Sequence, residues 1–214
     1  MALTLTFAVE RWPIAGSFAI SRGAKTEAVV VVAELSEGQA RGRGECVPYA
    51  RYGESVDSVS AAIEAMRPAL AAWLTREGLQ SAMPAGAARN ALDCAFWDLA
   101  AKRSGRRVHE LAGLSAPLPL TTALTISLGA PAEMAAAAAK ANHRALLKVK
   151  LGGSNDFGGD GARIAAVRAA APRATLIVDA NEGWNDGNLA VHLAACAAAG
   201  VVLVEQPLPE GRDA

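Results

Sequence analysis

Two lysines stand two residues apart in the apolar run Leu146-Leu-Lys148-Val-Lys150-Leu151. Strand alternation puts both side chains on one face of a β-strand. Neighbouring ammonium groups raise each other's cost of carrying charge, which lowers a lysine pKa toward the range useful for a general base. An edge strand with one solvated face is the alternative, but the apolar neighbours favour a functional lysine pair.

Carboxylates end the next two apolar runs, Leu176-Ile-Val-Asp179 and Val202-Leu-Val-Glu205. In a parallel barrel the carboxyl ends of the strands carry the chemistry, so these side chains are expected at one end with the lysines. Carboxylates on adjacent strands are ligands that Mg²⁺ prefers. Asp179 alone could instead cap a helix, but its repetition with Glu205 at the same strand position favours a metal site.

The elements that must position these residues follow residue 117. Strand-like runs at 122–127, 146–151, 175–180 and 201–205 alternate with alanine-rich helices that start near Pro131, Asp160 and Asp186. Runs this apolar are typical of parallel strands covered by helices. We therefore predict about four βα units of a TIM-type α/β barrel over residues 117–214. Since closure takes about eight strands, the barrel is expected to be partial, with an open edge after its fourth strand.

Residues 1–116 show a different order of elements. Strand patterns at 3–10, 27–35 and 42–48 come first, and helical patterns at 56–74 and 87–102 follow. Strands followed by helices are typical of an α+β unit. We predict a separate N-terminal α+β domain over residues 1–116.

Several motifs together resemble a known family. Lys148-Val-Lys150, Asp179-Ala-Asn181 and Glu205-Gln-Pro207 resemble the successive strand motifs of the enolase superfamily, in its muconate-lactonizing subgroup. The α+β region resembles the capping domain of that family. Finer motifs resemble dipeptide epimerases of the L-Ala-D/L-Glu type: Ile20-Ser-Arg22, Tyr49-Ala-Arg-Tyr52, Asn90 to Asp98, and Thr122-Ala-Leu-Thr125.

The resemblance implies a role for each residue at the strand ends. Lys150 would be the catalytic base, with Lys148 as its electrostatic partner. Asp179 and Glu205 would be ligands of Mg²⁺, and Asn181 would support them. The reaction implied is removal and return of the proton beside a substrate carboxylate, with Mg²⁺ stabilising the enediolate.

The resemblance also implies a small dipeptide as substrate, in murein peptide recycling. Arg22 would grip the glutamyl carboxylate, because a guanidinium binds carboxylates in a bidentate fork; a solvated loop arginine is the alternative. Thr125, Tyr49 and Tyr52 are expected to line the pocket, although a core or rim position would also suit them. The motif from Asn90 to Asp98 is expected to pack the capping domain against the barrel.

Two alternative functions stay open. Another reaction of the subgroup, cycloisomerisation or o-succinylbenzoate synthesis, would use the same lysines and carboxylates. The family's opposite-face lysine and third metal carboxylate come from later strands that these residues do not contain. The chain alone is therefore expected to be catalytically incomplete, and a fragment that needs a complementary barrel half is the second alternative.

The composition of the chain limits the classes of molecule that it is expected to bind. With 21 Lys and Arg against 21 Asp and Glu, there is no global charge that would attract nucleic acid. No apolar run approaches the roughly 20 residues of a membrane helix, and the three cysteines lack CxxC spacing. We expect a cytoplasmic protein with a small-molecule substrate, acting as a homo-oligomer or with a complementary barrel half.

Overall fold

The computed structural model describes residues 3–153 and 158–212. Contacts divide the chain into two compact units. The capping unit comprises residues 1–13 and 27–118, and the barrel unit comprises residues 14–26 and 119–214. Each unit has its own apolar core. The domain boundary at 116/117 stays a prediction.

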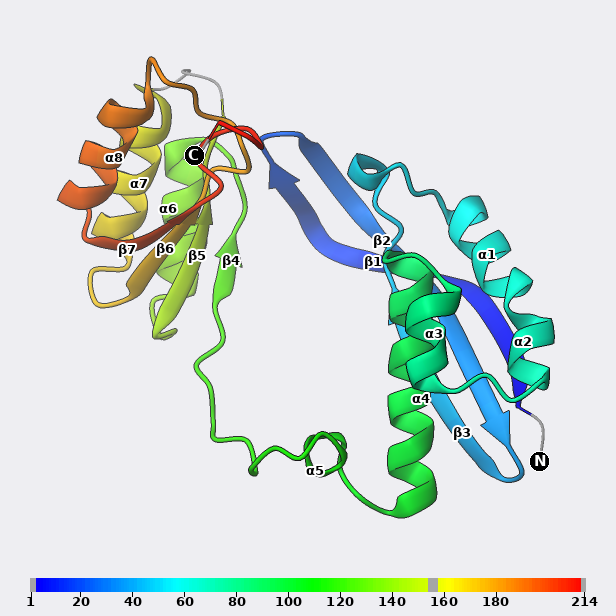
Figure 1. Ribbon diagram of the computed structural model, residues 1–214. Helices are drawn as coiled ribbons and strands as arrows, with labels where there is room; N and C mark the ends of the chain where they lie inside the picture. Colours follow the sequence, from blue (N-terminus) through cyan, green and yellow to red (C-terminus); the bar gives the residue numbers. More distant parts are fainter. Residues whose placement is uncertain (1–2, 154–157, 213–214) are drawn as a thin grey trace. The chain divides into compact units, whose positions relative to one another are not determined.

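The capping unit is built on a three-stranded sheet in the order β1-β2-β3, in which β2 and β3 are antiparallel. Its strands are β1 (Thr4–Ile20), β2 (Gly23–Glu37) and β3 (Ala40–Cys46), followed by a 3₁₀ turn η1 (Ala50–Tyr52). Its helices are α1 (Val56–Ala65), α2 (Arg67–Ala71), α3 (Arg76–Ala82), α4 (Ala87–Ser104) and α5 (Val108–Leu111). Figure 1 shows α4 lying along the sheet.

Three predicted elements of this region have different bounds in the structure. The strands predicted at 3–10 and 27–35 are parts of one long hairpin, whose outer half, residues 14–26, belongs to the barrel unit. The helix predicted at 56–74 is divided, because α1 ends at Ala65 and α2 begins anew at Arg67 with Pro68 in its first turn. Proline has no N–H to donate and fits only the first turn of a helix.

Close backbone contact joins α4 to β3. A Cβ atom at Gly44 would overlap the Ala91 carbonyl oxygen. Asn90 Nδ2 donates to the Glu45 carbonyl at 3.2 Å, and Asp98 Oδ2 accepts from the Arg43 N–H at 2.7 Å. The motif from Asn90 to Asp98 was expected to pack the capping domain against the barrel. The contacts described here lie inside the capping unit, where Gly44 lets α4 approach β3 closely. Packing of the motif against the barrel stays a prediction.

The barrel unit contains a four-stranded parallel sheet in the order β4-β5-β6-β7. Its elements are β4 (Leu124–Ile126), α6 (Pro131–Lys140), β5 (Leu146–Lys150), α7 (Gly159–Ala170), β6 (Thr175–Asp179), α8 (Leu189–Ala198) and β7 (Val201–Glu205). The three helices lie along one face of the sheet (Figure 1). The predicted fold class, an α+β capping domain followed by four strands of an α/β barrel, is confirmed.

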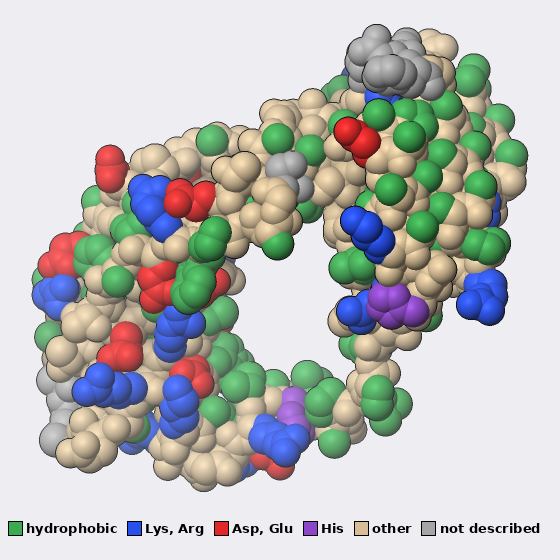
Figure 2. Space-filling view, turned by 180° about the vertical axis from the view of Figure 1, so that it is seen from behind, with side chains coloured by type: hydrophobic (Ala, Val, Ile, Leu, Met, Phe, Trp, Pro, Cys, Tyr) green, Lys and Arg blue, Asp and Glu red, His purple; other side chains and the backbone are tan. Residues whose placement is uncertain are grey.

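In the described part of the chain, no helix is long and apolar enough to cross a bilayer. Charged side chains of both signs are interspersed over the capping unit on the face drawn in Figure 2. That face therefore carries no large patch of a single charge.

Candidate active site

The strand register places the predicted site residues in two neighbouring rows. Lys150 pairs with Asp179, and Asp179 pairs with Glu205, so one row crosses β5, β6 and β7 at their carboxyl ends. Lys148 lies one step back, opposite Thr125 of β4. Because side chains two residues apart share a face, both rows point to the same side of the sheet.

Lysine and carboxylate side chains meet directly across these rows. Lys150 Nζ donates to Asp179 Oδ2 at 2.6 Å, and Lys148 Nζ lies 3.1 Å from the same oxygen. Lys148 Nζ also donates to Glu205 Oε2. The sequence prediction that these four residues converge at one end of the strands is confirmed in geometry, while their catalytic and metal-binding roles stay predictions.

Neighbouring charges shift the pKa values of Lys148 and Asp179. Burial lowers the pKa of Lys148, but hydrogen bonds to Glu205 and Asp179 more than compensate, and its pKa is raised. Burial likewise raises the pKa of Asp179. Hydrogen bonds from Lys150, the Asn181 backbone and Lys148 outweigh it, and that pKa is lowered. The lysine pair was expected to lower a lysine pKa; for Lys148 this is wrong, because carboxylates rather than its fellow ammonium are its nearest charges.

Asn181 supports the carboxylate of Asp179 through its backbone. The Asn181 N–H donates to Asp179 Oδ1 at 2.9 Å, and Asn181 itself has a left-handed φ of 48°. Asparagine is one of the few side chains that tolerate this conformation. The turn therefore aims a backbone donor at one oxygen of Asp179, while the lysines occupy the other.

The tip of the β1–β2 hairpin contacts the turn after β6. Ser21 Oγ donates to the Asn181 carbonyl at 2.9 Å, and Arg22 Nη1 donates to the same oxygen at 2.6 Å. Arg22 Nη1 also lies 3.1 Å from Glu182 Oε2. The Phe18 ring lies 5.6 Å from Lys150 Nζ, within cation–π range. Arg22 is thus brought next to the site, although its role in binding substrate stays a prediction.

The other predicted substrate residues occupy two places. Thr125 shares the sheet face of the lysines. Tyr49 and Tyr52 flank η1 in the capping unit, with ring centroids 5.7 Å apart. They line a groove of about 490 Å³ together with Glu54, Asn90 and neighbouring residues. Their part in a substrate pocket stays a prediction.

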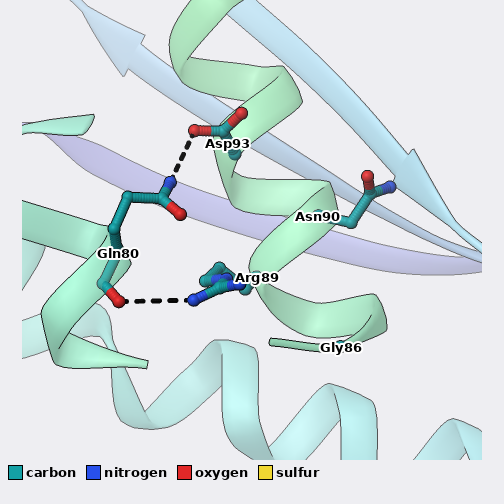
Figure 3. A pocket seen from close by; sticks show the side chains of 5 residues that line it. All are labelled: Gln80, Gly86, Arg89, Asn90 and Asp93. Carbon is teal, nitrogen blue, oxygen red and sulfur yellow. Dashed lines mark hydrogen bonds between the residues drawn. The ribbon is translucent and has the colours of Figure 1, made fainter. Parts of the chain in front are cut away.

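A polar cavity of about 330 Å³ between α3 and α4 is a rival site (Figure 3). Gln80 Nε2 donates to Asp93 Oδ1 at 3.0 Å, and Arg89 Nη1 donates to the Gln80 carbonyl at 3.3 Å. Asn90 uses its amide on the Glu45 carbonyl. These polar groups already bond to one another or to the backbone. We therefore interpret the cavity as part of the contact between α3 and α4 rather than as a reaction site.

The donor set at the strand ends suits a hard cation. Asp179 and Glu205 both contact the Lys148 ammonium, so positive charge already lies between them. The buried Asn181 Oδ1 has no hydrogen-bond partner among the residues described. Those residues contain no cluster of three His, Cys, Asp or Glu side chains. Two carboxylates with oxygens from water and substrate are nevertheless a usual set for Mg²⁺.

Sequence reasoning missed several contacts of this region. Glu182, which bonds Arg22, and Trp184 follow the Asp179-Ala-Asn181 motif but were given no role. Asp160 of α7 was named only as the start of a helix and Arg163 was not named, although both are buried. A charged pair three residues apart at the start of an otherwise apolar helix is the signal that could have drawn attention to them.

Comparison with known proteins agrees with this geometry. Residues 2–113 match the mandelate racemase/muconate lactonizing enzyme N-terminal domain, and residues 131–214 match the enolase C-terminal domain-like family. The chain is 49% identical to the L-Ala-D/L-Glu epimerase of Escherichia coli over 96% of its own length and 63% of that relative. It is 39% identical to an N-acetyl-D-glutamate racemase from Pseudoalteromonas, covering 86% of this chain and 58% of the relative.

Solved structures show the same likeness. An enolase family member from Agrobacterium tumefaciens, with homology to dipeptide epimerases and bound sodium and L-Ala-L-Glu, superposes with a TM-score of 0.92 at 51% identity. The match covers 99% of this chain and 64% of that one. A dipeptide epimerase from Cytophaga hutchinsonii, complexed with Mg and D-Ala-L-Val, gives 0.86 at 28% identity, covering 97% and 60%.

The chain thus spans somewhat less than two thirds of the length of these relatives. Within that span, two family models cover nearly all of the sequence, and the strand motifs that carry the resemblance form one cluster of charge. The chain belongs to the mandelate racemase/muconate lactonizing enzyme family of the enolase superfamily.

Proposed function

We propose that the protein catalyses Mg²⁺-dependent epimerisation of L-Ala-D/L-Glu-type dipeptides. The observation that carries this proposal is the meeting of Lys148, Lys150, Asp179 and Glu205 at the carboxyl ends of β5, β6 and β7. An amine base beside a cation-binding pair of carboxylates is what abstraction of a proton next to a carboxylate requires.

The chain's own residues divide the work. Lys150, in its neutral form, takes the α-proton, and the C–H bonding electrons pass into the substrate carboxylate. The Lys148 ammonium contributes positive charge close by. Mg²⁺, held by Asp179 and Glu205, would stabilise the second negative charge that develops on that carboxylate. The Asn181 N–H keeps Asp179 oriented. Inversion needs a proton delivered to the opposite face of the α-carbon, which the family's opposite-face lysine on a later strand would donate.

A glutamyl residue is the substrate group we propose for Arg22. Its guanidinium lies at the hairpin tip, next to the turn that follows Asp179. Both sequence relatives described above carry names that refer to glutamate, and the Agrobacterium tumefaciens structure holds bound L-Ala-L-Glu. A sheltered, charge-assisted contact between a guanidinium and a carboxylate would account for that preference.

Isotope exchange tests the proposal. The chain, alone and with a C-terminal extension that supplies further barrel strands, is incubated with L-Ala-D-Glu and Mg²⁺ in D₂O. NMR follows both deuterium uptake at the α-carbon and the ratio of diastereomers. We expect the extended form to exchange and invert. Absence of exchange in both forms, with the fold intact, would contradict the proposed function.

Further substrates separate the rival reactions of the subgroup. N-acetyl-D-glutamate in the same assay distinguishes a dipeptide epimerase from an N-acylamino acid racemase, because both reactions place a glutamyl carboxylate on Arg22 but only one needs the alanyl residue. A muconate and a succinylbenzoate precursor test the cycloisomerase and synthase alternatives. Turnover of either of these at a higher kcat/KM than the dipeptide would overturn the substrate assignment.

The outer edge of β7 supports a need for further structure. Val202 is 68% exposed and Leu203 is 50% exposed, although both lie in a strand of the barrel sheet. An exposed apolar edge strand can pair with another strand. We therefore propose a complementary barrel half as the partner that completes the site. If the opposite-face lysine comes from that half, the chain alone would exchange the α-proton at Lys150 without inverting the centre. Murein peptide recycling in the cytoplasm is the setting we propose.

A further inference from the structure

A buried carboxylate of α7 accepts three hydrogen bonds, from the loop after β5, from the loop after β6 and from its own helix. Asp160 is 2% exposed. Its Oδ2 accepts from the Gly152 N–H at 2.7 Å and from Trp184 Nε1 at 2.7 Å. Its Oδ1 accepts from Arg163 Nη1 at 3.0 Å. Gly152 follows β5 and Trp184 follows β6, so Asp160 joins the two loops that leave the strands of Lys150 and Asp179.

The partner of Asp160 reaches a third loop. Arg163 is 4% exposed, and its Nε donates to the Gly129 carbonyl, between β4 and α6, at 3.0 Å. One guanidinium therefore links the loop after β4 to the carboxylate that holds the loops after β5 and β6. A planar fork of fixed donors can make both contacts at once, whereas a lysine has only one nitrogen.

The loops that this pair joins are in direct backbone contact. A Cβ atom at Gly152 would overlap the Ala180 carbonyl oxygen, and Gly183 packs against the Gly152 backbone. Gly152 is two residues beyond Lys150, and Ala180 directly follows Asp179. A shift of either loop would therefore move the base relative to its carboxylate partner.

Stability alone is a poor explanation for this pair. Removing two charges from water costs several kcal/mol per ion, and apolar residues of similar volume often replace a buried ion pair without loss. What apolar residues cannot supply is a set of fixed bond directions to three loops at once. Those directions are useful at a reaction site, where a displacement of about 1 Å can cost roughly 100-fold in rate.

We propose that Asp160 and Arg163 are positioning residues, which brace the loops after β4, β5 and β6 and so hold Lys150 against Asp179. This inference rests on the proposed function for its catalytic consequence, but its structural part does not. None of the contacts described above joins the pair to the lysines or carboxylates of the site; the pair acts through the backbone at Gly152 and Gly129 and through the Trp184 indole.

Backbone and indole N–H resonances test the brace without any substrate. In ¹⁵N-labelled protein, Asp160→Asn removes the charge with little change in volume. We expect large shifts of the Trp184 indole and Gly152 amide signals, and a shift or broadening of the Asn181 amide, whose N–H bonds Asp179. An unchanged Asn181 amide would overturn the proposal, because the brace would then stop short of the site.

Arg168→Met is the matched control. Arg168 also lies on α7, and its guanidinium donates to the Ala199 carbonyl at 2.7 Å and the Ala174 carbonyl at 2.8 Å. Those carbonyls precede β7 and β6, so this arginine ties the opposite ends of the strands. The control should destabilise the barrel unit. It should leave the Asn181 amide signal unshifted and the rate of α-proton exchange within about twofold of the wild-type rate.

Kinetics complete the test in the form of the protein that exchanges the substrate proton. Asp160→Asn is expected to lower kcat about 10- to 100-fold with KM nearly constant, because the base is misplaced while substrate contacts persist. Arg163→Lys, which keeps the charge but not the fork, should show a smaller kcat loss and serves if Asp160→Asn fails to fold.

Equal kcat losses in Asp160→Asn and Arg168→Met, at matched loss of thermal stability, would overturn the positioning role. An unchanged kcat in Asp160→Asn would do so as well. If the wild-type protein shows no exchange at all, the proposed function fails on its own, and the Asn181 amide still decides whether the brace reaches the site.

Discussion

The capping unit and the barrel unit treat polar groups in opposite ways. Among the described residues, all six buried polar or charged side chains lie in the barrel unit: Lys150, Asp160, Arg163, Asp179, Asn181 and His192. The capping unit has an entirely apolar buried core in the part described, and none of the ion pairs described there joins two buried side chains; the pair of Lys102 and Asp98 is an example.

This difference separates two uses of sequence motifs. Burying a charge costs free energy unless it is paired, so charges persist in a core only where some other requirement keeps them. In the barrel unit the buried charges lie at the carboxyl ends of β5 and β6, at Lys150 and Asp179, and at the start of α7, at Asp160 and Arg163. In the capping unit the family motif from Asn90 to Asp98 joins a helix to a strand. We propose chemistry for the strand-end motifs of the barrel unit, whereas the motif from Asn90 to Asp98 contributes packing within the capping unit.

The largest expected effect is on the base. Lys150→Met should lower α-proton exchange by about 10²- to 10⁴-fold, the usual contribution of a positioned base, with little change in the circular dichroism spectrum. Lys102→Met is the control, because that lysine is exposed and bonds only Asp98 among the contacts described. Comparable losses in both variants would remove the contrast between the two units.

Overpacking the interface of α4 with β3 should give the next largest effect. Gly44→Ala is expected to cost about 3 kcal/mol of unfolding free energy, because the new methyl group meets the Ala91 backbone, which cannot yield. Urea unfolding measures this loss. Gly161→Ala is the control: its Cβ would meet only Ala195 Cβ at 3.6 Å, and alanine favours a helix by about 0.5–1 kcal/mol. Equal stability of both variants would show that α4 can shift.

Specificity at Arg22 should change by a smaller amount. In the active form, Arg22→Ala is expected to reduce kcat/KM for L-Ala-D-Glu by about 30- to 150-fold, from the roughly 2–3 kcal/mol of a sheltered charge-assisted contact. A dipeptide with an apolar second residue should lose far less. Arg11→Ala, which breaks an exposed ion pair with Glu27, should affect neither substrate. Equal losses for both substrates would assign Arg22 to holding the turn of Asn181 and Glu182 instead.

The smallest effect is expected from a surface carboxylate of the capping unit. Burial raises the pKa of Asp98, but the hydrogen bonds from Lys102 and the Arg43 N–H outweigh it and the pKa is lowered. A lowered folded pKa stabilises the protein above the unfolded value, near 3.8, and this stabilisation disappears as the pH falls through the folded pKa.

Asp98→Asn should therefore cost at most about 1 kcal/mol near neutral pH, because exposed ion pairs contribute little. Urea unfolding at pH 7 and at pH 3 measures the difference between variant and wild type. That difference should shrink toward zero at the lower pH. A cost that is larger at pH 3 would mean that the neutral, protonated Asp98 is the stabilising form.

Much of the candidate site could be predicted because its signals are local. Lys148 and Lys150 share a face through the alternation of a single strand, and Asp179 and Glu205 each end an apolar run. Parallel strands bring such ends together whatever else the chain does. The bounds of the capping helices were harder to predict. The helical pattern over residues 56–74 continues through Pro68, where the structure begins a new helix.

Only the tertiary structure decided which distant segments meet. Arg22 bonds the carbonyl of Asn181, 159 residues away, and Asp160 bonds the Trp184 indole. The hairpin tip also belongs with the barrel strands rather than with the sheet it extends. Periodicity indicates which face of an element is apolar. A hydrogen bond between distant residues depends instead on how whole elements are placed, and that placement results from many weak contacts between segments far apart in the sequence.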